Sequence, residues 1–172
     1  MTADQVKKAL VSAVPGLQAE LRPRPVGVRT RVEVPELWVD VSREGLVPVV
    51  AALKAAGPLH ISIISGRDKG EEIELLYHFA VGYGTPGGEV MVTLRVGVPA
   101  SDPTVPSICG ILPGAETTER EKIEFLGIHF TGIPSTAHVF LPDGFTGHPW
   151  RKDDPETARH VKRMVEWEGK DA

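Results

Sequence analysis

The stretch that decides the fold is residues 73–96, IELLYHFAVGYGTPGGEVMVTLRV. Its first part, Ile73–Val81, is rich in apolar and aromatic residues, as strands are. Its last part alternates apolar and other side chains, the apolar ones being Val90, Val92, Leu94 and Val96. Between the two parts, residues 82–88 are rich in glycine, which predicts a turn. Strands joined by a short turn are antiparallel neighbours, so the stretch predicts a hairpin of an antiparallel sheet.

The turn itself contains Gly82-Tyr83-Gly84-Thr85-Pro86-Gly87, which matches the dinucleotide-binding pattern G-x-G-x-x-G. In a dinucleotide site a helix begins at this motif and directs its N–H groups at the pyrophosphate. Here Pro86-Gly87-Gly88 leads directly into a strand of alternating valines. We therefore interpret the motif as a hairpin turn.

Three further strands and two helices are expected around this hairpin. The strands are residues 28–34, 37–41 and 59–65, and the helices are residues 2–14 and 46–56. Thr2 and Gln5 have the spacing of a capping box, Pro48 is tolerated in a first helical turn, and Gly57 ends the second helix. The pattern predicts an α+β fold, with an antiparallel sheet of about five strands and helices on one face.

The composition changes after residue 98, because proline and glycine become frequent and the alternation stops. We expect residues 1–98 to form the α+β domain. Residues 99–172 are expected to hold a linker (99–117), a short charged helix and an extended C-terminal tail that docks on a partner, within one structural domain overall. The last residues could add a helix from Glu156 to Trp167.

The charged helix is expected to begin at Thr118, whose hydroxyl could cap the first turn with Glu121 three residues on. Gly127 is suited to end the helix in the left-handed conformation. Arg120 and Glu124 are four residues apart and share a face. Arg120 is expected to pair with a carboxylate, either Glu124 or one from a neighbouring element or subunit.

The tail from His138 to Asp154 contains prolines and glycines that prevent a regular helix or a central strand. It also carries aromatic side chains of the kind that dominate protein interfaces, namely Phe140, Phe145 and Trp150. Such a segment either folds back on its own domain or docks on a partner. We predict docking, with a tail that is mobile in the isolated chain.

Composition and charge exclude several functions. The chain has 172 residues and a net charge of −4, which gives no basic footprint for nucleic acid. One cysteine, Cys109, excludes an internal disulfide and a cysteine-ligated cluster held by this chain alone. No apolar run approaches the roughly 18 residues of a spanning helix, and the N-terminus lacks a signal-peptide core. We expect any contact with a membrane to be made through partners.

The histidines are scattered singly and show no spacing typical of a zinc site. They are His60, His78, His129, His138, His148 and His160. No nucleophile elbow, P-loop or metalloprotease signature occurs. Glu119, Glu121 and Glu124 could act as acid–base residues, but beside Arg120 a salt-bridged surface is the simpler interpretation. We assign no residue a catalytic, cofactor-binding or metal-binding role.

Short motifs occur at Val98–Ser107, Glu119-Arg120-Glu121, Phe125–Ile128, Phe140–Asp143 and Gly147–Asp153. In their order and spacing, these motifs resemble the 30-kDa-subunit family of respiratory complex I. The same family includes counterparts in membrane-bound energy-converting [NiFe] hydrogenases. The resemblance covers roughly residues 25–155, and it is most specific over 98–153.

The resemblance implies an accessory structural subunit without a cofactor, in the peripheral arm of a complex I-like membrane redox complex. Its partners would be an iron–sulfur small subunit and a large subunit with a quinone site or a [NiFe] site, on the cytoplasmic side of the membrane. The iron–sulfur clusters, and a NiFe centre where present, would belong to those partners. The expected partner contacts are Glu119, Arg120, Glu121, Glu124, Phe140, Asp143, Phe145, His148, Trp150, Arg151 and Lys152.

Some positions depart from the complex I versions of the family. Those versions usually have aspartate where this chain has Glu124, and Gly-His-Pro where it has Gly132-Ile133-Pro134. The turn from Gly66 to Glu74 resembles the hydrogenase-type members. These features favour a hydrogenase-type complex. The alternatives are a subunit of an NADH- or ferredoxin-linked quinone oxidoreductase, a stand-alone interaction module, and a free-standing enzyme.

Overall fold

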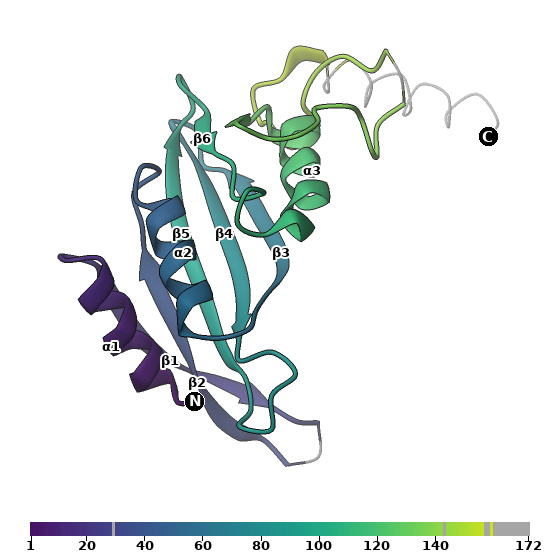
Figure 1. The fold of residues 1–172 in the computed structure, drawn as a ribbon. Helices are drawn as coiled ribbons and strands as arrows, with labels where there is room; N and C mark the ends of the chain where they lie inside the picture. Colours follow the sequence, from purple (N-terminus) through teal and green to yellow (C-terminus); the bar gives the residue numbers. More distant parts are fainter. Residues whose placement is uncertain (29, 143, 157–158, 160–172) are drawn as a thin grey trace.

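The computed structural model describes residues 1–28, 30–142, 144–156 and 159. Along the chain the elements are α1 (Ala3–Ala13), β1 (Gln18–Val26), β2 (Val32–Asp40), α2 (Leu46–Ala56), β3 (Leu59–Asp68), β4 (Glu72–Val81), β5 (Val90–Pro99), β6 (Thr104–Pro106), the 3-10 turn η1 (Pro113–Ala115), α3 (Glu116–Leu126) and β7 (His129–Thr131). Five of the strands, β1 to β5, form one sheet. Figure 1 shows α1 and α2 in front of this sheet and α3 beside β3.

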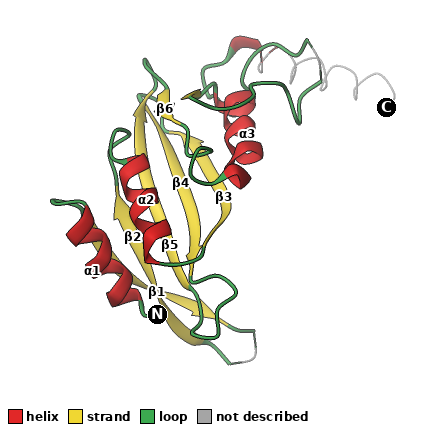
Figure 2. Ribbon diagram, viewed as in Figure 1, coloured by secondary structure: helices red, strands yellow, loops and turns green. Residues whose placement is uncertain are grey.

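The sheet has the strand order β1-β2-β5-β4-β3. Its neighbours are antiparallel except β2 and β5, which run parallel over Leu37–Asp40 and Val92–Arg95. β2 and β5 are parallel because the crossover through α2 leads from β2 to β3 at the far edge of the sheet. The chain then runs through β4 to β5, which lies between β4 and β2. The predicted α+β class, with helices on one face, is confirmed (Figure 2).

The two N-terminal helices form as their sequences predict. The Thr2 hydroxyl accepts the Gln5 N–H, and the Gln5 side chain accepts the Thr2 N–H, so the capping box of α1 is complete. α2 begins at Leu46, has Pro48 in its first turn and ends at Ala56, with Gly57 as its C-cap. The apolar faces of both helices are buried with the helix-facing side of the sheet in one core.

The strand expected at residues 28–34 is confirmed only from Val32, where β2 begins, and the strand before it was missed. β1 covers Gln18–Val26, a stretch whose Pro23 and Pro25 suggest a non-strand segment. β1 is an edge strand, where proline is tolerated because one side of the backbone needs no ladder partner. β2 continues through Pro35, opposite Pro23, because its pairing with β5 begins only at Leu37 and one side of its backbone needs no ladder partner before that residue.

At the opposite edge of the sheet, a side chain of α3 forms a hydrogen bond with the backbone of β3. The Ile64 N–H donates to the Thr118 hydroxyl of α3 at 2.9 Å. An edge strand with unpaired N–H and C=O groups is a template for aggregation. Prolines on β1 and α3 on β3 therefore protect the two edges by different means.

The segment after β5 is more regular than a linker. Residues 99–117 contain β6, η1 and the first residues of α3. β6 pairs in parallel with β7, so the chain on either side of α3 is joined. Most of the helix expected from Glu156 to Trp167 lies outside the described residues. Among the described residues, every helix is too short or too polar to cross a membrane.

Candidate functional site: helix α3 and the tail segment

Helix α3 begins earlier than expected. η1 runs directly into it at Glu116, and Thr118 lies inside the helix, so the predicted capping box at Thr118 is wrong. The hydroxyl of Thr118 binds the backbone of β3 instead. The predicted end is confirmed, since Gly127 has φ 69° and its N–H donates to the Ile123 carbonyl at 3.0 Å. Positive φ favours glycine at this position.

Three charged side chains of α3 are buried: Glu119, Lys122 and Glu124. Charged residues are rarely buried without partners, because removal from water is costly. Close packing between α3 and β3 contributes to this burial. A Cβ at Gly66 would lie 2.6 Å from Leu126 Cδ1, so a larger residue here would force the Leu126 side chain to move.

Glu119 points inward and binds the segment before η1. Its Oε1 accepts the Ile108 N–H at 2.8 Å, and its Oε2 accepts the Ser107 hydroxyl at 2.6 Å and the Cys109 thiol at 3.2 Å. Burial raises the pKa of Glu119 above its ordinary value, although these donors act in the opposite direction. Glu119 thus fastens the 107–109 turn to the helix.

Glu124 binds the start of the tail. Its carboxylate accepts the backbone N–H groups of three consecutive residues, Val139 at 2.5 Å, Phe140 at 3.0 Å and Leu141 at 2.7 Å. Burial alone would raise the pKa of Glu124, but the three N–H donors lower it below its ordinary value. The carboxylate fixes the tail directly beside α3.

Arg120 does not pair with Glu124. Its guanidinium donates to the carbonyl of Ala137 at 2.6 and 2.8 Å and to that of His138 at 3.3 Å. Its carboxylate neighbour is Glu116, one turn earlier, at 3.7 Å. Arg120 and Glu124 therefore hold adjacent parts of the same segment, one through carbonyls and the other through N–H groups.

An aromatic cluster covers the outer side of α3. Trp150 stacks on Phe125 with 4.5 Å between ring centroids, and Phe140 lies 6.1 Å from Phe125. The backbone N–H of Trp150 donates to the Phe125 carbonyl at 2.8 Å. The ammonium of Lys122 lies 4.8 Å from the Trp150 ring and forms an ion pair with Glu121. Lys122 is buried because Trp150 covers it.

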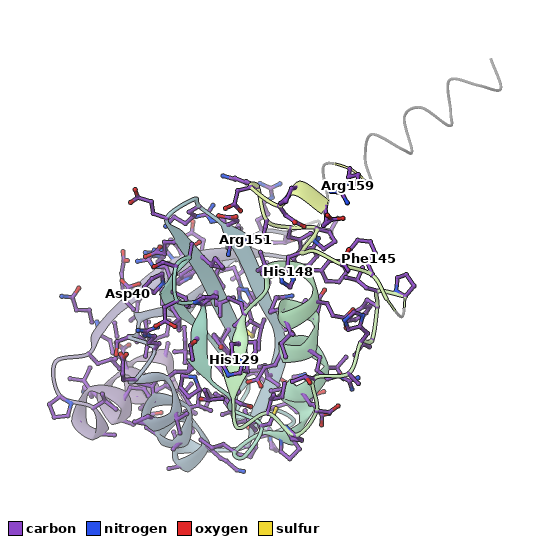
Figure 3. The ribbon with its side chains drawn as sticks, turned by 90° about the horizontal axis from the view of Figure 1, so that it is seen from above. Asp40, His129, Phe145, His148, Arg151 and Arg159 are labelled. Carbon is purple, nitrogen blue, oxygen red and sulfur yellow. The ribbon has the colours of Figure 1, made fainter. Side chains whose placement is uncertain are left out.

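The end of the tail is anchored on β3. Asp68 accepts the Lys152 N–H at 3.0 Å and pairs with the Arg151 guanidinium at 3.1 Å. Despite burial, these groups and the Gly70 N–H hold the pKa of Asp68 below its ordinary value. His148 Nδ1 lies 2.9 Å from the Glu124 carbonyl. Figure 3 shows His148 and Arg151 above the helix and the sheet.

The structure brings most of the expected contact residues together around α3. Asp143 lies outside the described residues. The sequence did not predict the roles of Lys122 and Asp68, since nothing local marks either: Asp68 lies in an apparently ordinary polar turn, 84 residues from Lys152.

The expectation that the tail docks on a partner and does not fold back differs from the structure. Residues 137–142 and 144–152 pack on α3 and β3 of their own domain, because Glu124, Arg120 and Asp68 supply partners for the tail backbone. The outward sides of two rings stay accessible, with Phe140 54% and Trp150 41% exposed. We call these rings, with exposed Val139, the aromatic patch.

The glycine motif at residues 82–87 forms the β4–β5 turn, as predicted. The Thr85 N–H donates to the Gly82 carbonyl and the Gly88 N–H to the Thr85 carbonyl, both at 3.1 Å, and β5 follows. Among the described residues, no group of three or more His, Cys, Asp or Glu side chains is arranged to hold a metal ion.

The sheet face away from α1 and α2 carries a polar row that crosses four strands. Thr93 donates to Glu36 at 2.8 Å, His78 Nδ1 lies 3.0 Å from Thr93 Oγ1, and Ser65 Oγ lies 3.3 Å from His78 Nε2. Burial lowers the pKa of His78. The sequence predicted a strand position for His78, but the row depends on the order of the strands.

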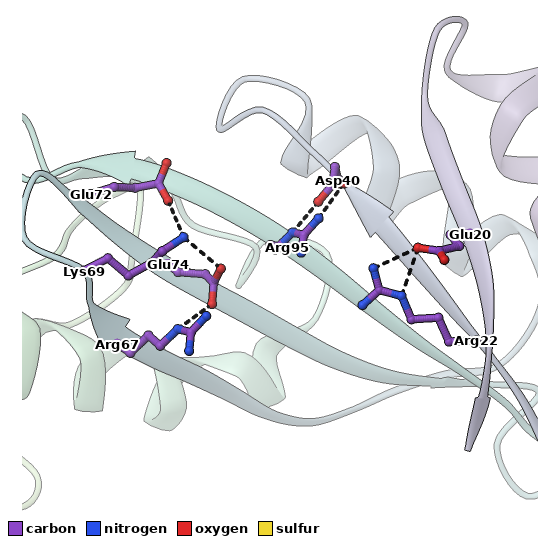
Figure 4. A network of polar contacts seen from close by, with 8 residues as sticks. All are labelled: Glu20, Arg22, Asp40, Arg67, Lys69, Glu72, Glu74 and Arg95. Atoms are coloured by element: carbon purple, nitrogen blue, oxygen red, sulfur yellow. Dashed lines mark hydrogen bonds and ion pairs between the residues drawn. The ribbon is translucent and has the colours of Figure 1, made fainter. Parts of the chain in front are cut away.

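A cleft of about 520 Å³ lies beside this face, between the α1–β1 connection and the ends of β2 and β5. Its charged side chains bind one another. Arg95 pairs with Asp40 at 2.5 Å, and Lys69 pairs with Glu72 at 3.2 Å and with Glu74 at 3.3 Å (Figure 4). These ion pairs reinforce the sheet and favour no particular ligand.

Comparison with known proteins identifies the family. The family model described as "Respiratory-chain NADH dehydrogenase, 30 Kd subunit" matches residues 39–160. The chain is 44% identical to the C subunit of the NADH-quinone oxidoreductase of Roseiflexus sp. (strain RS-1), over 73% of this chain and 74% of that protein. It is 42% identical to the corresponding protein of Herpetosiphon aurantiacus, over 74% and 76% of the two chains.

Other relatives are longer. The C subunit of the NADH-quinone oxidoreductase of Mycolicibacterium gilvum is 35% identical over 70% of this chain but only 54% of its own length, so the chain spans about half of that relative.

Among solved structures, one from "the membrane-bound sulfane sulfur reductase (MBS), an archaeal respiratory membrane complex" has a TM-score of 0.70 at 21% identity, over 93% and 89% of the two chains. A trypsin-resistant fragment of Nqo5 has a TM-score of 0.58 at 26% identity, over 76% and 98%. The chain belongs to the 30 kDa subunit family.

Proposed function

We propose that this member of the respiratory-chain NADH dehydrogenase 30 kDa subunit family is a cofactor-free interface subunit of a complex I-like redox complex. It has no catalytic residues of its own. It lies in the peripheral arm on the cytoplasmic side of the membrane, and it reaches the membrane only through its partners. Those partners are an iron–sulfur small subunit and a large subunit that carries the substrate-reducing site.

The observation that carries this proposal is the aromatic patch. Phe140 and Trp150 are positioned by the hydrogen bonds of the tail backbone to Glu124 and by the stack on Phe125, yet the two residues stay 54% and 41% exposed. Ordered, exposed aromatic side chains lose little conformational entropy on binding and are frequent interface anchors. The tail therefore contributes to docking as a preformed surface.

The protonation state of Cys109 supports the proposal that this chain holds no metal cluster of its own. The thiol is buried and donates to Glu119, and burial raises its pKa to about 11. A metal ligand must be a thiolate. At neutral pH Cys109 is a protonated core residue.

The names of the relatives favour a quinone oxidoreductase over the hydrogenase-type complex that the departures at Glu124 and Gly132–Pro134 suggest. The relatives that are 42–44% identical over about three quarters of both chains are C subunits of NADH-quinone oxidoreductases. We therefore propose a quinone-reducing assembly. Purified complex that reduces a quinone analogue and evolves no hydrogen would agree with this assignment, and hydrogen evolution would reverse it.

The interface role is tested with Phe140→Gln in the full chain, expressed with the neighbouring genes and purified by a tag. We expect the variant to fold and to recover much less of the iron–sulfur-bearing subunits, read from their absorbance. Tyr83→Gln is the matched control, because Tyr83 is 52% exposed and lies away from α3, stacked on His60 at 4.5 Å.

Equal recovery of the iron–sulfur subunits with both variants would remove the aromatic patch from the interface. Failure of the unaltered chain to recover any redox subunit would instead support a stand-alone interaction module.

A further inference from the structure

A second surface lies at the other end of the molecule, on the hairpin of β1 and β2. Residues 22–34, RPRPVGVRTRVEV, contain four arginines and one glutamate in a chain whose net charge is −4. We call this segment the basic arm. Such a local concentration of one charge, against the sign of the whole chain, marks a surface for an oppositely charged partner.

The basic arm projects beyond the sheet. β2 borders β5 only over Leu37–Asp40, whereas its ladder with β1 continues to the pair Val26 and Val32. The arm is therefore a two-stranded ribbon with no third strand, and Figure 1 shows it pointing away at the end opposite α3.

The arginines of the arm differ in their contacts. Arg22 donates to Glu20 at 2.8 and 2.9 Å and lies 4.6 Å from the Trp38 ring. Among the described residues, Arg24 and Arg31 form no hydrogen bond or ion pair with any side chain. Nε of Arg24 is also buried without an acceptor. A buried donor without a partner is rare in native proteins.

The arm is stiff for a projecting hairpin. Pro23 and Pro25 fix the backbone of β1, and Pro35 lies opposite Pro23. Gly27 has φ 96°, and a Cβ there would collide with the Thr30 carbonyl, so the turn requires glycine. A preorganised element loses less entropy on binding than a flexible loop.

We propose that the basic arm docks on a carboxylate-rich protein surface of another subunit in the same complex, with Arg24 and Arg31 as the pairing residues. This inference rests on the proposed function. Guanidinium groups bind carboxylates through two parallel hydrogen bonds, and arginine is enriched in protein interfaces where lysine is depleted. The arm contains arginine and no lysine.

Two other anionic partners fit less well. Membrane-binding segments add large apolar or aromatic side chains that insert between lipids, whereas the exposed apolar residues of the arm are Val28 and Val32. Single-stranded nucleic acid is bound with aromatic platforms, but Trp38, the aromatic residue beside the arm, is covered by Arg22. A protein surface with carboxylates around a small apolar contact matches both features.

The test uses the full chain in its complex, with Arg24→Glu/Arg31→Glu against Lys7→Glu/Lys8→Glu. The control makes the same charge change on α1. At physiological salt we expect roughly tenfold less of the arm variant in the purified complex and no loss of the control. Arg24→Gln/Arg31→Gln, which adds no negative charge, should show an intermediate loss that grows with added salt.

A photoreactive residue at position 31 identifies the contact. A cross-link to an acidic segment of another protein in the complex supports the proposal. Binding of the isolated chain to vesicles with phosphatidylserine, lost in the arm variant, would overturn it in favour of lipid. Normal assembly of both arm variants, with no cross-link, would overturn it while leaving the aromatic patch as the interface. An unaltered chain that never assembles would remove both proposals.

Discussion

Two glutamates on α3 show how the surroundings of single residues set opposite electrostatic behaviour. Glu119 and Glu124 are both buried, but burial dominates at Glu119 and three backbone N–H groups dominate at Glu124. The same residue type on one helix therefore has a raised pKa in one place and a lowered pKa in the other.

This contrast predicts opposite pH dependence for Glu119→Gln and Glu124→Gln. The lowered pKa of Glu124 stabilises the fold above the ordinary value of 4.5, and this contribution is lost as the pH falls through the folded pKa. The raised pKa of Glu119 stabilises the fold below 4.5, and that contribution is lost as the pH rises through its folded pKa.

Urea unfolding between pH 4 and pH 8 measures both effects. At pH 7 we expect Glu124→Gln to lower the free energy of unfolding by roughly 1.5–3 kcal/mol, because a charged acceptor for several N–H groups is lost. The free energy of unfolding of the wild type minus that of Glu119→Gln should fall as the pH rises. The corresponding difference between the wild type and Glu124→Gln should increase as the pH rises. Glu71→Gln, at an exposed position between β3 and β4, is the control. Parallel curves for the two variants would contradict the account.

At the scale of elements, α3 acts as the edge cover of β3. The Thr118 hydroxyl takes the place of a strand partner for the Ile64 N–H, and Gly66 allows the helix to lie close enough for this contact. Helix and strand therefore stabilise each other through one hydrogen bond and a tight packing contact.

We predict that Thr118→Val destabilises the chain by about 1–2 kcal/mol, because the partly buried Ile64 N–H loses its acceptor while the side-chain shape is kept. Hydrogen exchange at Ile64 should accelerate, and the chain should aggregate more readily when heated. Thr117→Val at the neighbouring exposed position should change neither. An unchanged exchange rate at Ile64 would show that β3 is protected by other means.

At the scale of the whole molecule, the tail is an outer layer added to a complete core. The described core ends with the partly buried Ile133, and no buried apolar residue of that cluster belongs to residues 137–156. The tail is held by polar anchors and ring stacking, so its contribution to stability is separable from that of the sheet.

A chain that stops at Phe140 should therefore keep the sheet, with unchanged far-ultraviolet circular dichroism and a modestly lower melting temperature. It should no longer assemble with the redox subunits, since Trp150 and Arg151 are lost. A chain that stops at Arg159 keeps both residues and is the control. Loss of the folded sheet in the shorter chain would mean that the tail belongs to the core.

The sequence alone determined the elements whose signals are local. The capping box of Thr2 and Gln5, the alternating valines of β5 and the glycine turn after β4 depend on residues close together in the chain, so their patterns can be read directly. Each family motif within 98–153 is also a run of consecutive residues. Two local interpretations failed, at β1 and at the start of α3, because position in the sheet and packing against β3 overrode local propensity.

Only the tertiary structure decided which charges are buried and what they bind. The parallel pair of β2 and β5, the contact of Asp68 with Arg151 and the three N–H groups at Glu124 join residues far apart in the sequence. Whether a glutamate is solvated or buried depends on what packs over it. The sequence of a helix does not show which segment will cover its surface. The tail could be recognised as an irregular aromatic segment, but its place on α3 depended on partners that come together only when the chain is folded.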